Sequence, residues 1–385
     1  MCRASASYRT DPGSYPLCDR VISNVVVYSG DSVRRAIRNP TSSSASSPST
    51  RDQLMDEMFT CLASGPGVFV VKRCMEDVDV LVRANAAFKT IIEREREGAG
   101  GSKGDHFAEA GKNDRIWSSF QKHAEVDPES FVKYYSNDVL ALACEAWLGP
   151  GYQITAQTNI VKPGGKAQQP HRDFHLGFQS PDVVARFPLA SQVASQLLTL
   201  QLAIAHTDMP LDSGPTQLLP FSQQFEHGYL AYHDPQFAQV FKEKMVQVEL
   251  EAGDAVFFSP ALFHAAGDNR TVDFERSANL LQVSACWSKP MESVDRDAIL
   301  RNTWPYIIKH VSSETDGVAA SSSQALLKAI CDGYSFPTNL DKDPPSDAGH
   351  CPETQLEMAI QAATSRLSGD GLEEQLATYA EKRRA

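Results

Sequence analysis

The chain has 385 residues, of which 42% are hydrophobic, so it can bury a large core without cross-links. Its formal net charge is −12. Nucleic acid and acidic membrane surfaces are bound by clusters of basic residues, so this charge argues against both as partners. It has no apolar run long enough for a transmembrane helix, its N-terminus lacks the apolar region of a secretory signal, and its cysteines form no CxxC pair, so we expect a cytoplasmic protein without a membrane or nucleic-acid partner.

The first part of the chain is predicted to be irregular and then helical. Residues 1–50 read as an arm with one short strand in "VISNVVVYSG" and a Ser-rich loop. Residues 51–150 show helical periodicity around one buried strand, "GVFVVKR", which indicates a helical cover. Within it, one helix face is expected to carry Leu54, Met58, Phe59 and Leu62. The glycine-rich stretch 98–104 lacks a Walker spacing, which favours a lid or linker over a phosphate loop.

The periodicity changes from 3.6 to 2 near residue 151. Alternating stretches such as "YQITAQTNIVKPGG", "QLLTLQLAIAHTDMP" and "SANLLQVSACW" predict a β-core over 151–290. Residues 291–385 return to helical periodicity and are expected to form a helical extension packed on that core. The order of helices, strands and helices predicts an α+β fold, with an antiparallel sandwich or barrel and helices on one face.

A candidate metal site begins in "QQPHRDFHLGF". In an extended segment His171 and Asp173 point to the same side, whereas Arg172 points away. This pair alone is weak, but His264 follows the apolar run "GDAVFFSPALF", and Arg276 opens the next strand. His-x-Asp…His is the ligand set of non-haem Fe(II) oxygenases. An arginine suits the far carboxylate of a 2-oxo acid because its planar fork binds carboxylates in a bidentate way.

Three stretches resemble the phytanoyl-CoA dioxygenase family of Fe(II)/2-oxoglutarate-dependent oxygenases: "KPGGKAQQPHRDFH", "DSGPTQLLPFSQQ" and "LEAGDAVFFSPALFHAAGDNRTVDFER". The resemblance implies a double-stranded β-helix, that is, a jelly-roll or cupin-like core. It implies Fe(II), 2-oxoglutarate and O₂ as cofactors, with His171, Asp173 and His264 as iron ligands. It also implies that Arg276 holds the C5 carboxylate of 2-oxoglutarate and that Lys162 touches this co-substrate. Because the gap from His264 to Arg276 departs from the family spacing, Arg270 is a rival.

Other polar residues near these motifs have two readings. Thr199 and Gln201 face one side of an otherwise apolar strand and, if inward, need partners. Those partners are either the co-substrate, which makes Thr199 a cofactor-binding candidate, or a buried structural network. His175 is expected to support the site and His206 to lie in the core or at its rim. Packing roles are expected for Phe174, Phe178, Cys286 and Trp287.

The combined prediction is a dioxygenase that hydroxylates a small-molecule substrate with release of succinate and CO₂. One alternative is a zinc hydrolase, since two histidines and a carboxylate also serve zinc, but a hydrolase has no need of Arg276. A second alternative is a cupin-like binding protein without catalysis. The sequence leaves the substrate and the oligomeric state open.

Overall fold

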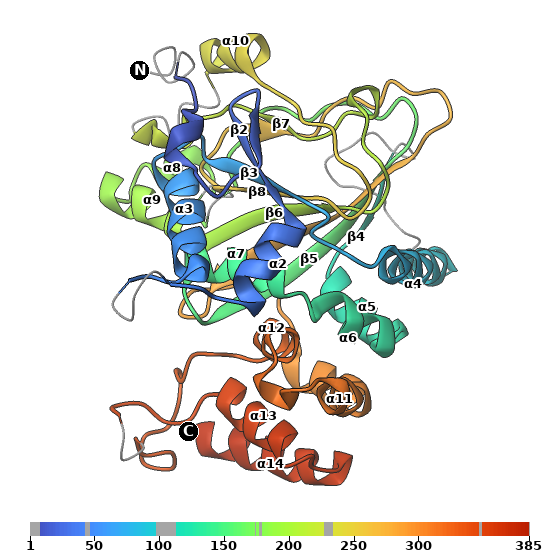
Figure 1. Ribbon diagram of the computed structural model, residues 1–385, viewed down its shortest axis with the longest axis vertical. Coiled ribbons are helices and arrows are strands. Elements are labelled where there is room, and N and C mark those ends of the chain that lie inside the picture. Colours follow the sequence, from blue (N-terminus) through green and yellow to red (C-terminus); the bar gives the residue numbers. More distant parts are fainter. Residues whose placement is uncertain are drawn as a thin grey trace.

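The computed structural model describes residues 8–42, 47–97, 113–173, 175–176, 179–226, 234–345 and 349–384. They form an α+β fold with two sheets and flanking helices (Figure 1), as predicted. The glycine-rich stretch 98–104 and the side chains of Phe174 and Phe178 lie outside the described residues.

The larger sheet has eight strands in the order β1-β2-β3-β8-β6-β10-β5-β4. All neighbours are antiparallel except β2 and β3, which are parallel. In that order the strands span Arg20–Ile22, Val25–Ser29, Val68–Lys72, Ala255–Phe258, Thr199–Ala205, Arg276–Ala285, Tyr152–Val161 and Asn113–Ile116. The three alternating stretches quoted for the β-core correspond to β5, β6 and β10, which are neighbours in this sheet.

A smaller sheet faces the larger one. It consists of β7 (Gln217–Leu218) and β9 (His264–Ala265), extended by single bridges from His171 to His264 and from Leu218 to Val246. Leu218 packs in one buried cluster with Val70 and Ala203 of the larger sheet. The two facing sheets form the expected jelly-roll core, with room for a site between them.

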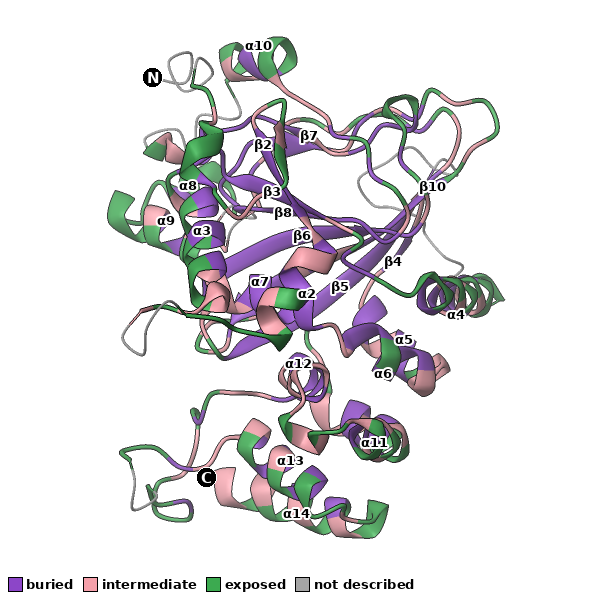
Figure 2. Ribbon diagram, viewed as in Figure 1, coloured by how far each residue is buried: buried purple, intermediate pink, exposed green. Residues whose placement is uncertain are grey.

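Helices cover the outer face of the larger sheet. Ile154, Leu200 and Val283 on that face share one continuous buried cluster with helix residues from both ends of the chain, and Figure 2 shows the strands of the sheet mostly in the colour of buried residues. The helices on this side are α2 (Gly30–Arg38), α3 (Thr50–Ala63), α4 (Val78–Glu97), α5 (Ser119–Val126), α6 (Pro128–Tyr135), α7 (Asp138–Leu148), α11 (Arg296–Ser313) and α12 (Ser321–Ile330). Beyond them, α13 (Gln355–Thr364) and α14 (Gly369–Arg383) pack on α11 and α12, farther from the sheet (Figure 1). Three further helices, α8 (Pro181–Val184), α9 (Leu189–Ser195) and α10 (Pro235–Lys244), lie outside this helical layer.

The N-terminal segment differs from the irregular arm that the sequence predicts. Residues 20–29 form β1 and β2, and β2 pairs with β3 inside the larger sheet. Residues 25–28 are fully buried. "VISNVVVYSG" is thus a hairpin that belongs to the core, because its apolar run packs on both faces of the sheet.

Helix α3 buries a different face from the one expected. Leu54, Met58 and Leu62 are buried as predicted, but the Phe59 side chain is 43% exposed and Cys61 is buried in its place. With 3.6 residues per turn, positions 54, 58, 61 and 62 share a face, whereas position 59 is rotated about 140° from position 54. Within the part of the chain described, no helix is long and apolar enough to cross a membrane.

Candidate metal centre

Backbone pairing brings the predicted ligands together from two distant segments. The N–H of His171 donates to the carbonyl of His264 at 3.0 Å, and the reverse bond is 3.1 Å. The N–H of Asp173 donates to the carbonyl of Pro260 at 2.9 Å. His171 and Asp173 thus lie in an irregular segment held against β9, not in a regular strand. Their side chains still point to the same side, as the spacing of two predicts.

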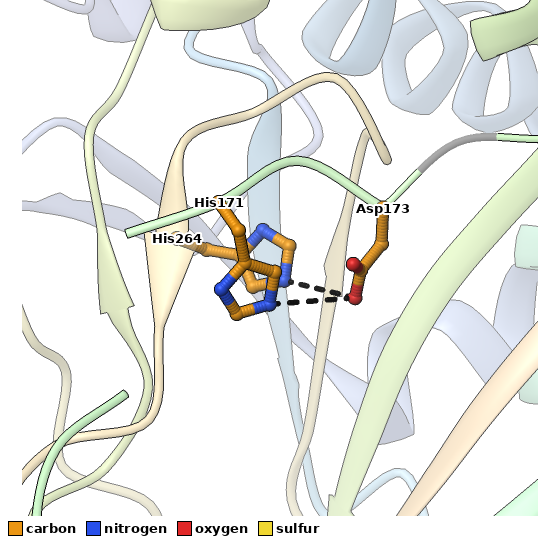
Figure 3. Close-up of side chains that lie close together, drawn as sticks. All are labelled: His171, Asp173 and His264. Atoms are coloured by element: carbon orange, nitrogen blue, oxygen red, sulfur yellow. Dashed lines mark ion pairs between the residues drawn. The ribbon is translucent and has the colours of Figure 1, made fainter. Parts of the chain in front are cut away.

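The three side chains converge on one point (Figure 3). Asp173 Oδ2 lies 3.6 Å from Nε2 of His171 and 3.5 Å from Nε2 of His264. All three donor atoms lie within 4.8 Å of one another. Two imidazole nitrogens and one carboxylate oxygen at these separations fit a single divalent ion.

Hydrogen bonds on the far side of each ring select the tautomer that a metal needs. Nδ1 of His171 lies 2.7 Å from the carbonyl oxygen of Gln169, and Nδ1 of His264 lies 2.9 Å from that of Leu262. A carbonyl only accepts, so each Nδ1 carries the hydrogen. Each Nε2 therefore presents its lone pair toward Asp173, which is how second-layer contacts orient metal-binding histidines.

The charges at the site favour a bound cation. Burial raises the pKa of Asp173, but His171 and His264 act against it and hold that pKa well below its usual range. Burial lowers the pKa of His171, and the Asp173 carboxylate more than reverses this, so the pKa is raised. A carboxylate that stays ionised in a buried place is a ready ligand, because metal binding requires the deprotonated form.

Arg172 turns away from the centre, as predicted. Its Nη2 donates to the carbonyl of Ser222 at 2.6 Å, and its guanidinium lies over the Phe263 ring, 4.2 Å from the centroid. This arginine stabilises the packing behind the site.

The centre opens into a cavity of about 580 Å³ between the two sheets. Arg276, at the start of β10, lines this cavity and is only 6% exposed. Among the described residues its Nε and Nη2 have no hydrogen-bond partner. Burial lowers its pKa to about 10, so it remains charged at neutral pH. A buried cation without a partner calls for an anion.

Arg270, the rival to Arg276, is exposed and does not line the cavity. The structure thus favours Arg276 as the cation that meets an anion next to the metal centre.

Lys162 and Thr199 have other partners outside the cavity lining. Nζ of Lys162 lies 2.9 Å from Oδ2 of Asp114. Oγ1 of Thr199 donates to Nδ1 of His175 at 2.9 Å, and Nε2 of His175 donates to the carbonyl of Lys289 at 2.6 Å. Neither residue lines the cavity, so a contact of either with 2-oxoglutarate stays a prediction. Thr199 and His175 belong to one chain of hydrogen bonds that ends on Lys289.

The remaining expectations divide. His206 lies in the core, where Nε2 accepts from the Tyr134 hydroxyl at 2.8 Å and Nδ1 donates to Oδ1 of Asn85 at 2.7 Å. Cys286 is half-buried, and Trp287 is 58% exposed, so the core role expected of these two was wrong. They follow the end of β10, where the chain leaves the sheet.

The sequence did not predict the contacts of two further residues near the metal centre, Gln201 and Arg115. Gln201 on β6 donates from Nε2 to Asp173 Oδ2 at 2.9 Å, so its inward polar side chain serves a metal ligand. Arg115 on β4 is buried, lines the cavity and donates from Nη1 to Oε1 of Gln157 at 3.1 Å. The only signal for Arg115 was the short alternation in "NDRIW", which is too brief to predict a strand.

Comparisons with known proteins agree with this geometry. The model of the family described as "Phytanoyl-CoA dioxygenase (PhyH)" matches residues 64–278. "Dioxygenase cdmD" of Talaromyces verruculosus is 28% identical over 235 residues, which cover 59% of this chain and 70% of that protein. "Dioxygenase olcK" of Penicillium canescens is 31% identical over 162 residues, which cover 40% of this chain and 46% of that protein.

Among solved structures, a similar one is described as a "non-heme alpha ketoglutarate dependent carbocyclase SnoK from nogalamycin biosynthesis". It aligns with a TM-score of 0.46 and 19% identity, covering 68% of this chain and 93% of that chain.

Proposed function

Because this chain belongs to the phytanoyl-CoA dioxygenase family of Fe(II)/2-oxoglutarate-dependent oxygenases, we propose that it hydroxylates a small-molecule substrate with release of succinate and CO₂. One observation carries this proposal. The triad His171, Asp173 and His264 shares a cavity with the buried, unpartnered guanidinium of Arg276.

The triad is suited to Fe(II). Nε2 of His171, Nε2 of His264 and a carboxylate oxygen of Asp173 would hold Fe(II) and would leave room on it for 2-oxoglutarate and O₂. When bound, Fe(II) with 2-oxoglutarate and O₂ supplies the oxidising chemistry that acts on a C–H bond. The protein contributes the geometry: backbone bonds fix His171 to β9 and Asp173 to Pro260, and Gln201 holds the Asp173 carboxylate.

Arg276 is suited to the C5 carboxylate of 2-oxoglutarate. Its planar fork accepts a carboxylate in a bidentate way, which would satisfy the Nε and Nη2 groups that lack partners. Burial makes this contact stronger than it would be in water. The cavity walls around it keep bulk water from the charged pair.

No observation favours either alternative. A zinc hydrolase has no use for Arg276, and a binding protein without catalysis explains neither the oriented imidazoles nor the buried cation. For location, we keep the cytoplasm as a proposal, since the cysteines in the described part of the chain are all free thiols. Cell fractionation with a tagged chain tests it, and recovery in a secreted or membrane fraction would contradict it.

The function is tested on the purified full-length protein under anaerobic conditions. Adding Fe(II) and 2-oxoglutarate should give the visible charge-transfer band of a chelated 2-oxo acid. His171→Ala and His264→Ala should lose this band. In air, the wild type should release succinate and the variants should not. A wild type without band or succinate, or variants that keep both, would overturn the assignment.

A further inference from the structure

The register of the larger sheet orders the side chains that face the cavity into rows. Gln282 on β10 lies opposite Gln201 on β6 and opposite Thr155 on β5. All three line the cavity. They form one polar row across three adjacent strands, and Gln201 ties this row to the metal ligand Asp173.

The guanidinium of Arg276 belongs to the other end of the same face. Arg276 is six residues before Gln282 on β10, about 20 Å of strand at roughly 3.3 Å per residue. Arg115 also starts near that end, opposite Asn159, but its Nη1 reaches Oε1 of Gln157, which lies opposite Leu280. The polar row itself consists of uncharged side chains. The cavity thus has a cationic end, and its other end, the neutral end, is lined by this uncharged row.

The amide of Gln201 shows what the neutral end requires. One hydrogen of its Nε2 is used by Asp173, and its acceptor Oε1 is buried and has no partner among the described residues. An acceptor repels a carboxylate, so Oε1 does not serve 2-oxoglutarate. A buried acceptor is costly unless a donor meets it. The molecule that fills this end therefore carries a hydroxyl or N–H group.

The surroundings of the row add an apolar requirement. In the next row toward the cationic end, Leu280 lies opposite Ala203 on one side and opposite Gln157 on the other, and all three line the cavity. Met291, 40% exposed, lines the cavity beyond the end of β10. Gln282 is partly buried and lines the cavity, so its amide can donate to an oxygen of the bound molecule or accept from a hydroxyl group.

We propose that the row Gln201–Gln282–Thr155 is the subsite for the primary substrate. The substrate is a neutral, largely apolar molecule, and one of its hydroxyl groups donates to Oε1 of Gln201 beside the metal centre. This inference rests on the proposed function and names its substrate class.

The test measures binding of three probes to the full-length protein by ligand-observed NMR. The protein carries Zn(II) in place of Fe(II), with 2-oxoglutarate, so that the signals stay sharp. The probes are 1-adamantanol, adamantane-1-carboxylate and palmitoyl-CoA. The two adamantanes share one apolar skeleton and differ only in their polar group. We expect the alcohol to bind and to bind more tightly than either anion.

Two variants test the row and one controls for it. Gln282→Met and Gln201→Met should each weaken binding of the alcohol about 3–10-fold, which is the effect of losing one hydrogen bond between neutral groups. Gln282→Met should leave the Fe(II)–2-oxoglutarate band unchanged, since it touches neither triad nor Arg276. Gln239→Met, the same change at an exposed position of α10, should alter neither. If Gln201→Met disturbs Asp173, the Gln282→Met variant still tests the proposed subsite.

Each outcome of the binding experiment either supports the proposed subsite or overturns it. A wild type that binds an anion more tightly than the alcohol, or that does not bind the alcohol, overturns the subsite. Equal alcohol binding by the wild type and both Met variants also overturns it. The charge-transfer band separates the two proposals: its absence from the wild type defeats the function, whereas a normal band with a failed probe result defeats only the substrate class.

Discussion

At the scale of single residues, Arg276 holds a permanent charge in a place with no counter-charge among its described neighbours. That arrangement destabilises the protein unless an anion arrives. Replacing Arg276 by alanine should therefore weaken 2-oxoglutarate binding at least about 100-fold, as expected for removing one member of a buried ion pair, while the fold becomes no less stable. The measurement is titration of the charge-transfer band with 2-oxoglutarate.

Arg270→Ala is the matched control, because Arg270 is exposed and lies outside the cavity. Arg276→Lys should restore only part of the affinity, since an ammonium cannot form the bidentate pair. If Arg270→Ala has the larger effect, the two arginines have been assigned the wrong way round.

Two core histidines predict sensitivity to acid. Burial lowers the pKa of His206 to about 3, aided by His123, and burial lowers that of His123 to about 4. Below pH 6.5 the unfolded chain binds protons that the folded chain cannot, so stability is full above that pH and falls as the pH drops toward 4. Lowering the pH from about 7.5 to about 5.0 should therefore reduce the free energy of unfolding by on the order of 1–2 kcal/mol for each histidine.

Urea unfolding at both pH values measures this loss. In His206→Gln, the free energy of unfolding should fall less between the two pH values than in the wild type, because this variant lacks one of the two histidines. This holds whatever the stability of the variant is at pH 7.5. His350→Gln, at an exposed position, should keep the full difference. A wild type equally stable at both values would contradict the argument.

For single residues, the sequence predicted orientation where it depends on local spacing alone. A spacing of two residues places His171 and Asp173 on the same side of the chain and Arg172 on the other. The contacts of Lys162 and Thr199 could not be predicted, because their partners Asp114 and His175 come from segments whose positions only the folded chain defines. The partner of Gln201 was equally hidden.

At the scale of elements, the hairpin of β1 and β2 is a structural part of the sheet. Val26 is fully buried and lies opposite Phe69 of β3, whereas Ile22 is 36% exposed. Val26→Asp should therefore destabilise the protein by at least about 3 kcal/mol, since it buries an unpaired charge. Ile22→Asp should cost about 1 kcal/mol or less. Thermal unfolding followed by circular dichroism compares them, and equal melting temperatures would mean that the segment is a dispensable arm.

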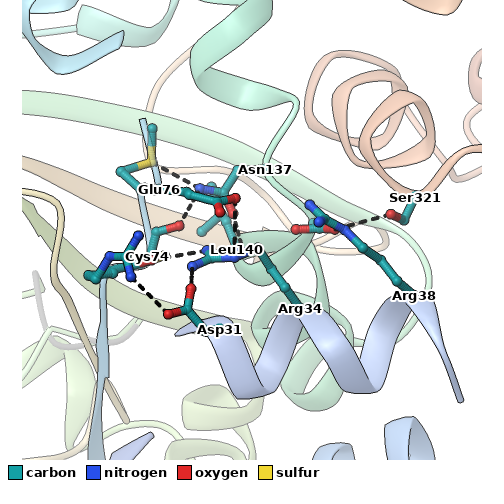
Figure 4. A network of polar contacts seen from close by, with 11 residues as sticks. Asp31, Arg34, Arg38, Cys74, Glu76, Asn137, Leu140 and Ser321 are labelled. Atoms are coloured by element: carbon teal, nitrogen blue, oxygen red, sulfur yellow. Dashed lines mark hydrogen bonds and ion pairs between the residues drawn. The ribbon is translucent and has the colours of Figure 1, made fainter. Parts of the chain in front are cut away.

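Helix α2 reinforces the same attachment (Figure 4). Arg34 is buried and contacts Asp31 at 2.7 Å and Glu76 at 3.3 Å, and it donates to the carbonyl of Arg73 at 3.0 Å. Arg38 reaches Asp138 of α7 at 3.8 Å. Such contacts join segments far apart in sequence, so periodicity within a short window could not reveal them.

Element length explains what could be predicted. The long strands β5, β6 and β10 have enough residues for a period of two to emerge, and they were found. Strands β7 and β9 have two residues each, so they leave no periodic signal, although β9 carries His264.

At the scale of the whole molecule, helices from both ends share one buried cluster. Leu54 of α3, Phe131 of α6 and Trp304 of α11 all belong to it. We therefore expect one cooperative unfolding transition, not a separate one for residues 291–385. Calorimetry tests this by comparing the measured enthalpy with the van't Hoff enthalpy. Two resolved transitions would show that the C-terminal helices are an independent unit.

The mutual backbone bonds of His171 and His264 have one more consequence. The peptide groups of two metal ligands hold each other, and Asp173 is fastened to Pro260 in the same way, so the site is assembled before any ion arrives. An incoming ion meets a chelator whose conformational entropy was already lost during folding. Exchange of the ion can then proceed while the surrounding sheets stay in place, and the empty and loaded proteins should share one shape.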